Sequence, residues 1–295
     1  MLTVVILNYR DAKRSLLCVQ NVLAEGADYV LVWDNSADAG MSAADIQAGN
    51  PDPERVRIII SPHNYGFAAG VNRAIEFALI DRPGSWILLI NNDAQLYHGA
   101  IEIMCNVLLE NKNARIVSPL INNNASIQGR TWYQHLTGLL FKRRHFGCSS
   151  HPSGCCFLLA PERIVLPLFD ERFFMYGEDC ALGIRFQAPE DIIWLEKVLV
   201  FHEGSASSGL GSPFYEERMV AAHLLLARYI AKSRFYYLIL LSIRFIVLPV
   251  RALVRAIRFR SVVPFVALWR GVLIAAGRDP LRQAISAPET PECTP

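Results

Sequence analysis

The sequence of 295 residues lacks several features that would place it in a common structural class. Its seven cysteines are odd in number and irregularly spaced, and none belongs to a Cys-x-x-Cys pair. This pattern argues against a structural zinc site or a disulfide framework and favours reduced thiols in a cytosolic compartment. The N-terminal residues include no basic segment and no small-residue cleavage site, so we expect no signal peptide.

The chain as a whole has almost no net charge, but its two parts carry net charges of opposite sign. Residues 1–200 contain 17 Lys and Arg against 21 Asp and Glu, whereas the residues from 201 onward contain 12 against 6. Between residues 218 and 282 there are 12 basic residues and one acidic residue, Asp279. Such asymmetry indicates an anionic partner for the second half. Nucleic acid fits poorly, because this half is rich in apolar residues and carries no nucleic-acid-binding motif.

Short apolar runs alternate with helical patterns along the first 120 residues. The runs at 4–7, 29–33, 58–60 and 86–90 contain no polar alternation, which is typical of strands in a parallel sheet covered on both faces. Residues 121–152 are predicted to be an irregular excursion. Strand character resumes at 154–160, a helix is predicted at 178–186 and an extended segment at 192–200. A Gly- and Ser-rich loop at 203–213 is a candidate mobile segment or domain junction.

Polar residues follow each predicted strand of the first half. Ligands bind at the carboxyl ends of strands in sheets of this kind, so these residues are candidate site residues. After the fourth strand, Asn91-Asn92-Asp93 can place an oxygen ligand on a divalent cation that holds a diphosphate. The alternative is a plain turn, because Asn and Asp are common turn residues.

Two further stretches have the composition of a functional site. Residues 64–72 contain Gly66 and Gly70 at a predicted helix start, where backbone can approach an anion; ordinary strand-to-helix packing is the alternative. Residues 169–179 interleave four carboxylates with four aromatics. Aromatic crowding can tune Asp179 as a general base, although acidic residues at a helix start also serve as caps. His202 follows an apolar strand and is a metal ligand only if it meets Asp93.

Taken together, these stretches resemble the family 2 inverting glycosyltransferases, especially their bacterial rhamnosyltransferase-like branch. The resemblance covers about residues 1–210 and consists of V-V-I-L-N-Y-R, V-W-D-N-S, N-Y-G-F-A-A-G-V-N-R-A, L-L-I-N-N-D-A, S-G-C-C-F-L-L-A, F-D-E-R-F-F-M-Y-G-E-D and H-E-G-S-A-S, in that order. It implies a GT-A fold, which is an α/β architecture with a mostly parallel, nucleotide-binding sheet flanked by helices.

The resemblance also implies a role for each matching residue. The nucleotide would contact Asn8, Tyr9 and Asp34. The diphosphate and sugar would contact Asn64, Gly66, Gly70, Asn72 and Asn92. The cation, Mg²⁺ or Mn²⁺, would be held by Asp93 and His202, with the amide of Asn91 in the first position of the family's acidic motif. The acceptor would face Ser153 and Gly154. Asp179 would be the catalytic base, paired with Glu178. The chain departs from the family at Gly177 and Ala181.

The implied reaction is an inverting transfer from a nucleoside-diphosphate sugar to a lipid-linked or polysaccharide acceptor. The branch suggests a deoxysugar donor such as dTDP-rhamnose. Two alternatives stay open. A sugar nucleotidyltransferase would need a glycine-rich basic loop after the first strand, and residues 8–11 are not such a loop. A catalytically inactive, membrane-associated scaffold is favoured by the amide of Asn91.

The basic second half is predicted to be helical from about 214 to 277. Arg244, Arg251, Arg255 and Arg258 share one helix face, and Pro249 should kink or interrupt that helix. Residues 235–250 are too few to span a bilayer and include Arg244. We expect the helix to lie on an anionic membrane surface with its arginines toward headgroups. Packing on the catalytic domain or on a second copy of the chain is the alternative.

The predicted organisation therefore has three parts. Residues 1–212 form the catalytic domain, 213–284 form a membrane-surface or oligomer-contact region, and 285–295 form a disordered tail. We expect a peripheral protein at the cytoplasmic face of the bacterial inner membrane.

Overall fold

The computed structural model describes residues 1–124, 126–204 and 209–286. The first elements are β1 (Leu2–Asn8), α1 (Ala12–Ala24), β2 (Tyr29–Asp34), α2 (Met41–Ala48), β3 (Val56–Ile60), α3 (Gly66–Asp81), β4 (Trp86–Asn91), β5 (Ala94–Leu96) and α4 (Ala100–Glu110). Next come β6 (Ile116–Asn122), β7 (Ile127–Gln128), β8 (Thr131–Gln134), β9 (Leu140–Phe141), β10 (Cys148–His151), β11 (Cys156–Leu159), the short helix η1 (Pro161–Arg163), α5 (Glu178–Arg185) and β12 (Ile192–His202). The chain continues with α6 (Pro213–Ile230), α7 (Arg234–Phe259), α8 (Val263–Ala275) and α9 (Pro280–Ser286).

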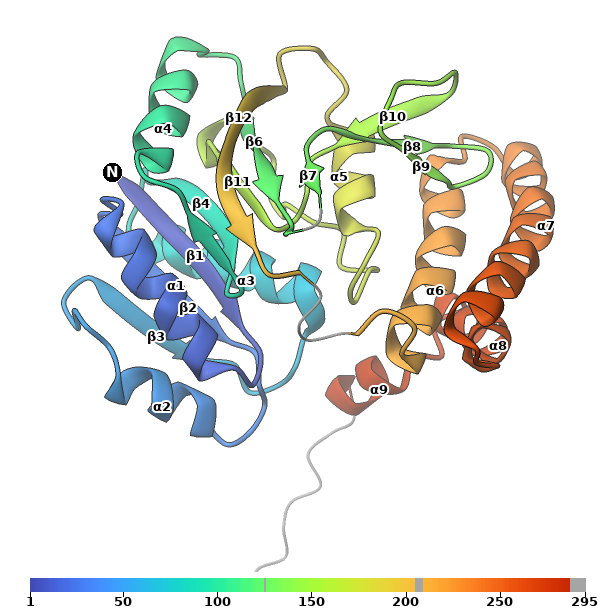
Figure 1. The fold of residues 1–295 in the computed structure, drawn as a ribbon, viewed down its shortest axis with the longest axis horizontal. Helices are drawn as coiled ribbons and strands as arrows, with labels where there is room; N and C mark the ends of the chain where they lie inside the picture. Colours follow the sequence, from blue (N-terminus) through green and yellow to red (C-terminus); the bar gives the residue numbers. More distant parts are fainter. Residues whose placement is uncertain (125, 205–208, 287–295) are drawn as a thin grey trace, which may run out of the picture.

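The main sheet has the strand order β3-β2-β1-β4-β11-β6-β12-β5, with β7 beside β6. Its first four strands are parallel, β11 runs antiparallel to both of its neighbours, and β5 runs antiparallel to β12. Helices cover the sheet (Figure 1), and one apolar cluster fills each face. The predicted α/β class with a mostly parallel, helix-flanked sheet is confirmed.

A second, smaller sheet occupies the stretch that was predicted to be irregular. Strands β10, β8 and β9 pair antiparallel between residues 131 and 151. Each contains only two to four residues, and only the two-residue β9 is apolar throughout. Periodicity cannot detect strands this short, so the prediction of an irregular excursion was wrong for this stretch.

The C-terminal helices lie together on the side of the molecule away from α1 and α2 (Figure 1). The helical region predicted there is present. The buried side of α6 shares an apolar cluster with the segment around α5, which includes Phe173, Cys180, Ala222 and Leu226. Helix α6 therefore begins where the second region was predicted to start, yet it completes the core beside α5.

Three arginines of α7, Arg244, Arg251 and Arg255, point inward, which corrects the predicted orientation. Arg244 is fully buried and donates hydrogen bonds to the carbonyl oxygens of His135 and Leu136 and to the hydroxyl of Tyr133. Arg251 and Arg255 pair with the buried carboxylate of Glu216. The physical reason is that these carbonyls and this carboxylate need donors, and a guanidinium supplies five. Headgroup contact by this face is therefore excluded for three of the four arginines.

The outer face of α7 and α8 is apolar instead. Its exposed side chains include Phe235, Leu238, Ile246, Val254, Ile257 and Trp269. Pro249 lies inside α7 without ending the helix, because Leu248 and Ala252 on either side of it stay packed against the neighbouring helices. By length and composition alone, α7 is also long and apolar enough to cross a membrane, which is weak evidence for a span.

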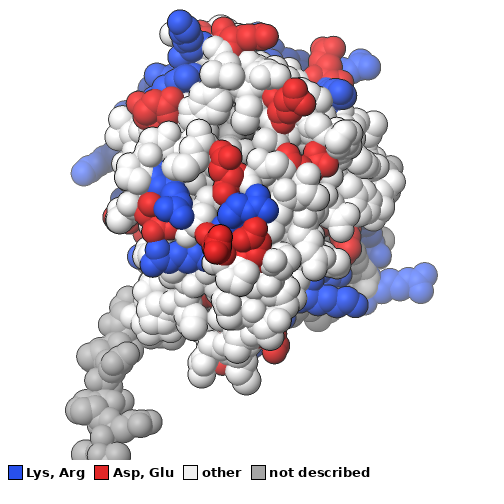
Figure 2. Space-filling model, turned by 90° about the vertical axis from the view of Figure 1, so that its left-hand side faces the viewer, with Lys and Arg blue, Asp and Glu red and all other residues white. Residues whose placement is uncertain are grey.

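Charges are mixed on the side of the surface that is opposite the C-terminal helices (Figure 2). On the side of the molecule at the left of Figure 1, acidic and basic side chains are interspersed and separated by neutral residues (Figure 2). Of the predicted tail, residues 285 and 286 belong to α9 and residues 287–295 lie outside the described residues, as do 205–208 of the predicted mobile loop.

Candidate functional site

A cavity of about 460 Å³ opens where β1 and β4 end. Nine of the sequence-predicted residues line it: Tyr9, Asn91, Asn92, Asp93, Ser153, Gly154, Glu178, Asp179 and His202. They come from five separate segments, which follow β1 and β4, precede β11, open α5 and end β12. The sheet thus brings residues that are far apart in the sequence to one cavity.

Asp93 and His202 face each other across the pairing of β5 with β12. The strand pairing sets His202 opposite Ala94, the residue after Asp93. Nε2 of His202 lies 3.1 Å from Oδ1 of Asp93, and Nδ1 lies 2.8 Å from Oδ1 of Asn123. When Nδ1 donates to Asn123, a neutral imidazole keeps its lone pair on Nε2, directed at the carboxylate.

This donor set fits a divalent cation. A lone pair that faces a carboxylate oxygen is repulsive unless a proton or a cation lies between them. Mg²⁺ binds its ligands at about 2.0–2.1 Å in an octahedron, which puts adjacent ligand atoms about 3 Å apart. The measured separation between Asp93 and His202 is 3.1 Å. Asn91 and Asn92 also line the cavity, and the side-chain amide of Asn92 donates to Ser15 at 3.1 Å.

Asp179 lies in the first turn of α5, directly after Glu178. Its Oδ1 accepts the backbone N–H of Cys180 at 2.7 Å. Although burial opposes ionisation, the neighbouring His151 lowers the pKa of Asp179 below its ordinary value. Burial, reinforced by the charge of Asp179, raises the pKa of Glu178 to about 8. At neutral pH the two adjacent carboxyl groups therefore carry about one negative charge between them.

Gly177, which departs from the family pattern, has a local structural explanation. It precedes α5 with φ of +93°, in the left-handed region that favours glycine. An added Cβ would also lie 2.9 Å from the ring of Phe173 and 3.0 Å from Ala222 on α6. A bulkier residue here would push α6 away from the start of α5.

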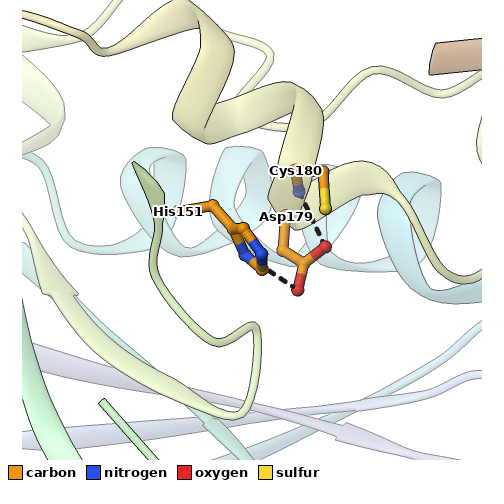
Figure 3. Close-up of side chains that lie close together, drawn as sticks. All are labelled: His151, Asp179 and Cys180. Atoms are coloured by element: carbon orange, nitrogen blue, oxygen red, sulfur yellow. Dashed lines mark hydrogen bonds and ion pairs between the residues drawn. The ribbon is translucent and has the colours of Figure 1, made fainter. Parts of the chain in front are cut away.

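His151 was not predicted from the sequence. It ends β10 and points at Asp179, beside Cys180 (Figure 3). A nitrogen, a carboxylate oxygen and a sulfur of these three residues lie within 4.8 Å of one another. Burial raises the pKa of the Cys180 thiol to about 11, so the thiol stays protonated and is a poor metal ligand. The only sequence signal was a lone histidine two residues before the predicted acceptor segment.

Asn8 and Asp34 form a buried network beneath the cavity. The Asn8 amide donates to Asp34 at 2.8 Å, and its oxygen accepts the hydroxyl of Ser15 at 2.7 Å. Oδ2 of Asp34 is buried and has no hydrogen-bond partner within the described part of the chain. A buried acceptor without a donor is costly, so this oxygen is suited to a ligand N–H or O–H.

Besides Asn8 and Asp34, four predicted residues do not line the cavity. Asn64 bonds to Asn35, Gly66 packs against Phe174, Gly70 lies against Leu7, and Asn72 bonds to the backbone of Phe169. An added Cβ at Gly66 would lie 2.2 Å from the carbonyl oxygen of Phe174. Gly66 and Asn72 thus join α3 to the chain that leads to Asp179, whereas Asn64 and Gly70 pack against the ends of β2 and β1.

Several lining residues were missed by the sequence analysis: Leu7, Arg10, Asp11, Arg14, Phe67, Cys155, Met175 and Tyr176. Arg14 places positive charge at the cavity and is paired with Asp11 and Glu203. A basic residue at the start of α1 gave no periodic or motif signal, because only the fold brings it next to β4.

Known proteins share this architecture. The sequence pattern of glycosyl transferase family 2 matches residues 3–161, which is more than half of the chain. An N-acetylglucosaminyl-diphospho-decaprenol L-rhamnosyltransferase, found in two strains of Mycobacterium tuberculosis, is 24% identical over 213 residues. That match covers 61% of this chain and 68% of the relative.

A solved structure agrees at the level of the fold. A mannosyltransferase from Pyrobaculum calidifontis, in complex with GDP-Man and Mn²⁺, superimposes with a TM-score of 0.51 at 16% identity. The match covers 97% of this chain and 78% of that one. Together with the family pattern, these likenesses favour glycosyl transfer over the alternatives that the sequence left open. The chain belongs to glycosyl transferase family 2 and is a glycosyltransferase.

Proposed function

We propose that this glycosyltransferase moves a sugar from a nucleoside-diphosphate sugar to an acceptor hydroxyl in a single inverting displacement, assisted by a divalent cation. The observation that carries the proposal is that Asp179 and the Asp93–His202 pair line one cavity. A single displacement needs one base and no carboxylate nucleophile, unlike a retaining reaction.

In this proposal Asp179 accepts the proton of the acceptor hydroxyl. Its lowered pKa supports the role, because the carboxylate is ionised and ready at neutral pH. A positioned general base contributes about 10²–10⁴-fold to the rate. Glu178 is mostly protonated below pH 8, so it does not add a second negative charge beside the base. Ser153 and Gly154 would face the acceptor from the other wall.

Asp93 and His202 would hold Mg²⁺ or Mn²⁺, with the amide oxygens of Asn91 and Asn92 nearby. When bound, the cation stabilises the negative charge that develops on the leaving diphosphate. The Mn²⁺ in the mannosyltransferase complex supports a divalent ion. Tyr9 would line the nucleotide site, and Asp34 would contribute to it through its hydrogen bond with Asn8, which precedes Tyr9.

The mycobacterial relative supports a narrower donor and acceptor class. Its name specifies an L-rhamnosyl group and a diphospho-decaprenol-linked acceptor. We infer a deoxyhexose donor such as dTDP-rhamnose and a polyprenyl-linked or polysaccharide acceptor. Such an acceptor lies at a membrane, and the apolar outer face of α7 and α8 suits a peripheral position on the cytoplasmic leaflet of a bacterial inner membrane.

The test is a thermal-shift panel of sugar nucleotides with and without Mn²⁺, followed by transfer assays with the stabilising donor. We expect Asp179→Asn to bind the donor normally and to lose transfer by about 10²-fold or more. We expect Asp93→Asn to lose the Mn²⁺-dependent part of donor binding.

Asp170→Asn is the matched control, because this carboxylate lies nine residues away on the same segment and pairs with Arg172 outside the cavity. It should transfer sugar at the wild-type rate. Undiminished turnover by Asp179→Asn would remove Asp179 as the base.

A further inference from the structure

His151 is a buried histidine that has no role in the proposed reaction as described above. It is 4% exposed and ends β10 in the small sheet. Its Nδ1 lies 3.4 Å from Oδ2 of Asp179 and 3.0 Å from the carbonyl oxygen of Pro152. Nε2 is buried and has no partner in the described ranges. The ring therefore faces two polar side chains of α5, Asp179 and Cys180, and of these two Asp179 is the one that is ionised at neutral pH (Figure 3).

Packing, rather than a loop, places this histidine. Gly183 on α5 lies directly against β10, because an added Cβ would be 2.2 Å from the carbonyl oxygen of Ser150 and 2.5 Å from Cβ of His151. The missing side chain at 183 lets the strand approach the helix closely enough for the imidazole to meet Asp179. The small sheet thereby becomes part of the support for the base.

The two oxygens of Asp179 are held from two sides. Oδ1 accepts the N–H of Cys180 on α5, while Oδ2 faces His151 on β10. These two contacts fix the plane of the carboxylate, which would otherwise rotate freely. Each carboxylate oxygen has two lone pairs, so a substrate hydroxyl can still be accepted.

We propose that His151 is a positioning residue for Asp179, which fixes the plane of its carboxylate and keeps it ionised until the acceptor hydroxyl arrives. The inference rests on the proposed function, in which Asp179 is the base. In the step itself the acceptor O–H bond breaks and its proton passes to Asp179. The oxygen bonds to the anomeric carbon, and the diphosphate leaves with the electron pair of the old bond. His151 keeps its hydrogen bond throughout.

Electrostatics agree with this arrangement. The other titratable groups acting on the pair are Glu178 and Cys180, both on α5. Burial disfavours a charged imidazole, but Cys180 and Asp179 raise the pKa of His151 well above its ordinary value. Because the Cys180 thiol stays protonated around neutral pH, Asp179 is the neighbour that supplies a full negative charge there. An imidazolium therefore faces a carboxylate around neutral pH, and the buried pair has no net charge.

The first test is the pH profile of transfer by His151→Asn, in which the amide keeps a donor near the position of Nδ1 but removes the charge. Without the imidazolium, the pKa of Asp179 should rise. We expect the acid limb of kcat to move up by about one pH unit, which makes kcat about tenfold lower on that limb while the plateau is largely kept. The KM for the donor should not change.

His135→Asn is the control, because this histidine directly follows β8 of the same small sheet but bonds to Ser149. Its profile should match the wild type. An unshifted acid limb in His151→Asn, or an equal loss of kcat at every pH, would overturn the proposal, since a purely structural histidine gives one of these results.

The second test does not depend on activity. Imidazole titration by NMR should place the pKa of His151 well above 6.5 in the wild type and lower it in Asp179→Asn. Equal values in the two proteins would overturn the contact. A wild-type protein with the raised His151 pKa but no transfer with any donor would leave the contact standing and count against the proposed function alone.

Discussion

At the Asp93–His202 pair, one hydrogen bond decides which imidazole nitrogen faces the carboxylate. Asn123 accepts from Nδ1 at 2.8 Å and so leaves Nε2 toward Asp93. Partners of this kind orient the ligand ring, and their loss costs about 10–100-fold in metal affinity. Asn123 directly follows β6, and no sequence pattern indicated that this segment would contact His202.

We expect Asn123→Ala to weaken Mn²⁺ binding by about 10–100-fold. The measurement is a Mn²⁺ titration of the thermal stabilisation by donor. Asn111→Ala, at the end of α4, removes an amide that bonds only to Val107 and should leave the affinity unchanged. Equal Mn²⁺ affinity in wild type and Asn123→Ala would mean that His202 is not a ligand.

The buried carboxyl of Glu178 makes stability depend on pH. Its pKa is raised from 4.5 to about 8 in the folded protein. Between these values the folded state binds more protons than the unfolded state, so the free energy of unfolding falls as pH rises. Glu178→Gln removes this titration. The Tm of the variant minus that of the wild type should therefore increase from pH 4.5 to about 8. Parallel Tm curves would contradict the buried, protonated state.

Much of the site could be predicted from sequence, and the rest depends on packing. Asp93 and Asp179 stand in motifs next to strong strand and helix signals, so their neighbourhood was accessible. His151 was not, because it meets Asp179 through β10, a strand too short for periodicity to reveal. Asn72 was assigned to the ligand, although its amide bonds to Phe169. An asparagine motif cannot distinguish a ligand contact from a buried turn contact.

Among the elements, the start of α3 is held against the segment before α5. Gly66 has φ of +78°, and an added Cβ would lie 2.2 Å from the carbonyl oxygen of Phe174. Gly26 has a similar φ of +93°, but its Cβ would meet open space. Substitutions at Gly26 and Gly66 therefore allow the cost of backbone strain to be distinguished from the cost of a steric clash.

Gly26→Ala should cost about 1–2 kcal/mol, because only the left-handed backbone is penalised. Gly66→Ala should cost about 1–3 kcal/mol more, because the neighbouring chain must also move. Urea unfolding of both variants gives the comparison. Equal losses of stability would show that the contact with Phe174 is not tight.

Helix α7 is anchored by its buried arginine. Arg244→Met would remove the donor from four acceptors, and each unsatisfied buried group costs about 1–3 kcal/mol. We expect a loss of at least about 3 kcal/mol in the free energy of unfolding. Arg258→Ala, on the exposed side of the same helix, should stay within about 0.5 kcal/mol of the wild type. A small effect at Arg244 would mean that α7 is loosely docked.

The parallel strands were predicted well, since 29–33 and 86–90 match β2 and β4 to within one residue. Long, continuously buried runs leave little choice of structure. The face of α7 was assigned wrongly for a different reason. Spacing placed four arginines on one side, but Arg258 is exposed while the other three are directed inward. Spacing also cannot say whether that side meets lipid, water or a carboxylate such as Glu216.

At the scale of the whole molecule, the outward apolar face of α7 and α8 predicts how the protein meets a bilayer. Burial of an apolar side chain is worth about 1.5–3 kcal/mol, so Ile246→Ser with Trp269→Ser should weaken vesicle binding at least tenfold. Because Arg244, Arg251 and Arg255 point inward, the apolar part of this binding should survive high salt, and only the exposed Arg234 and Arg258 of α7 should add a salt-sensitive part.

Leu109→Ser changes an exposed apolar residue on α4 and is the control for vesicle flotation. Release of the wild-type protein from the vesicles by salt alone would instead indicate that electrostatic attraction to lipid headgroups holds it there. These substitutions are sharper than truncation after residue 212, which would also strip Ala222 and Leu226 from the core beside α5.

The backbone N–H of Phe67 donates to the carbonyl oxygen of Phe174 at 2.7 Å. This hydrogen bond links the first turn of α3 to the segment that precedes α5, which contains the proposed base Asp179. If either segment moved away alone, this hydrogen bond would break, so the two segments should move together. A substitution that shifts the start of α3 should therefore also shift the segment that leads to Asp179. In the proposed reaction, donor and acceptor specificity could then not be changed independently at these two segments.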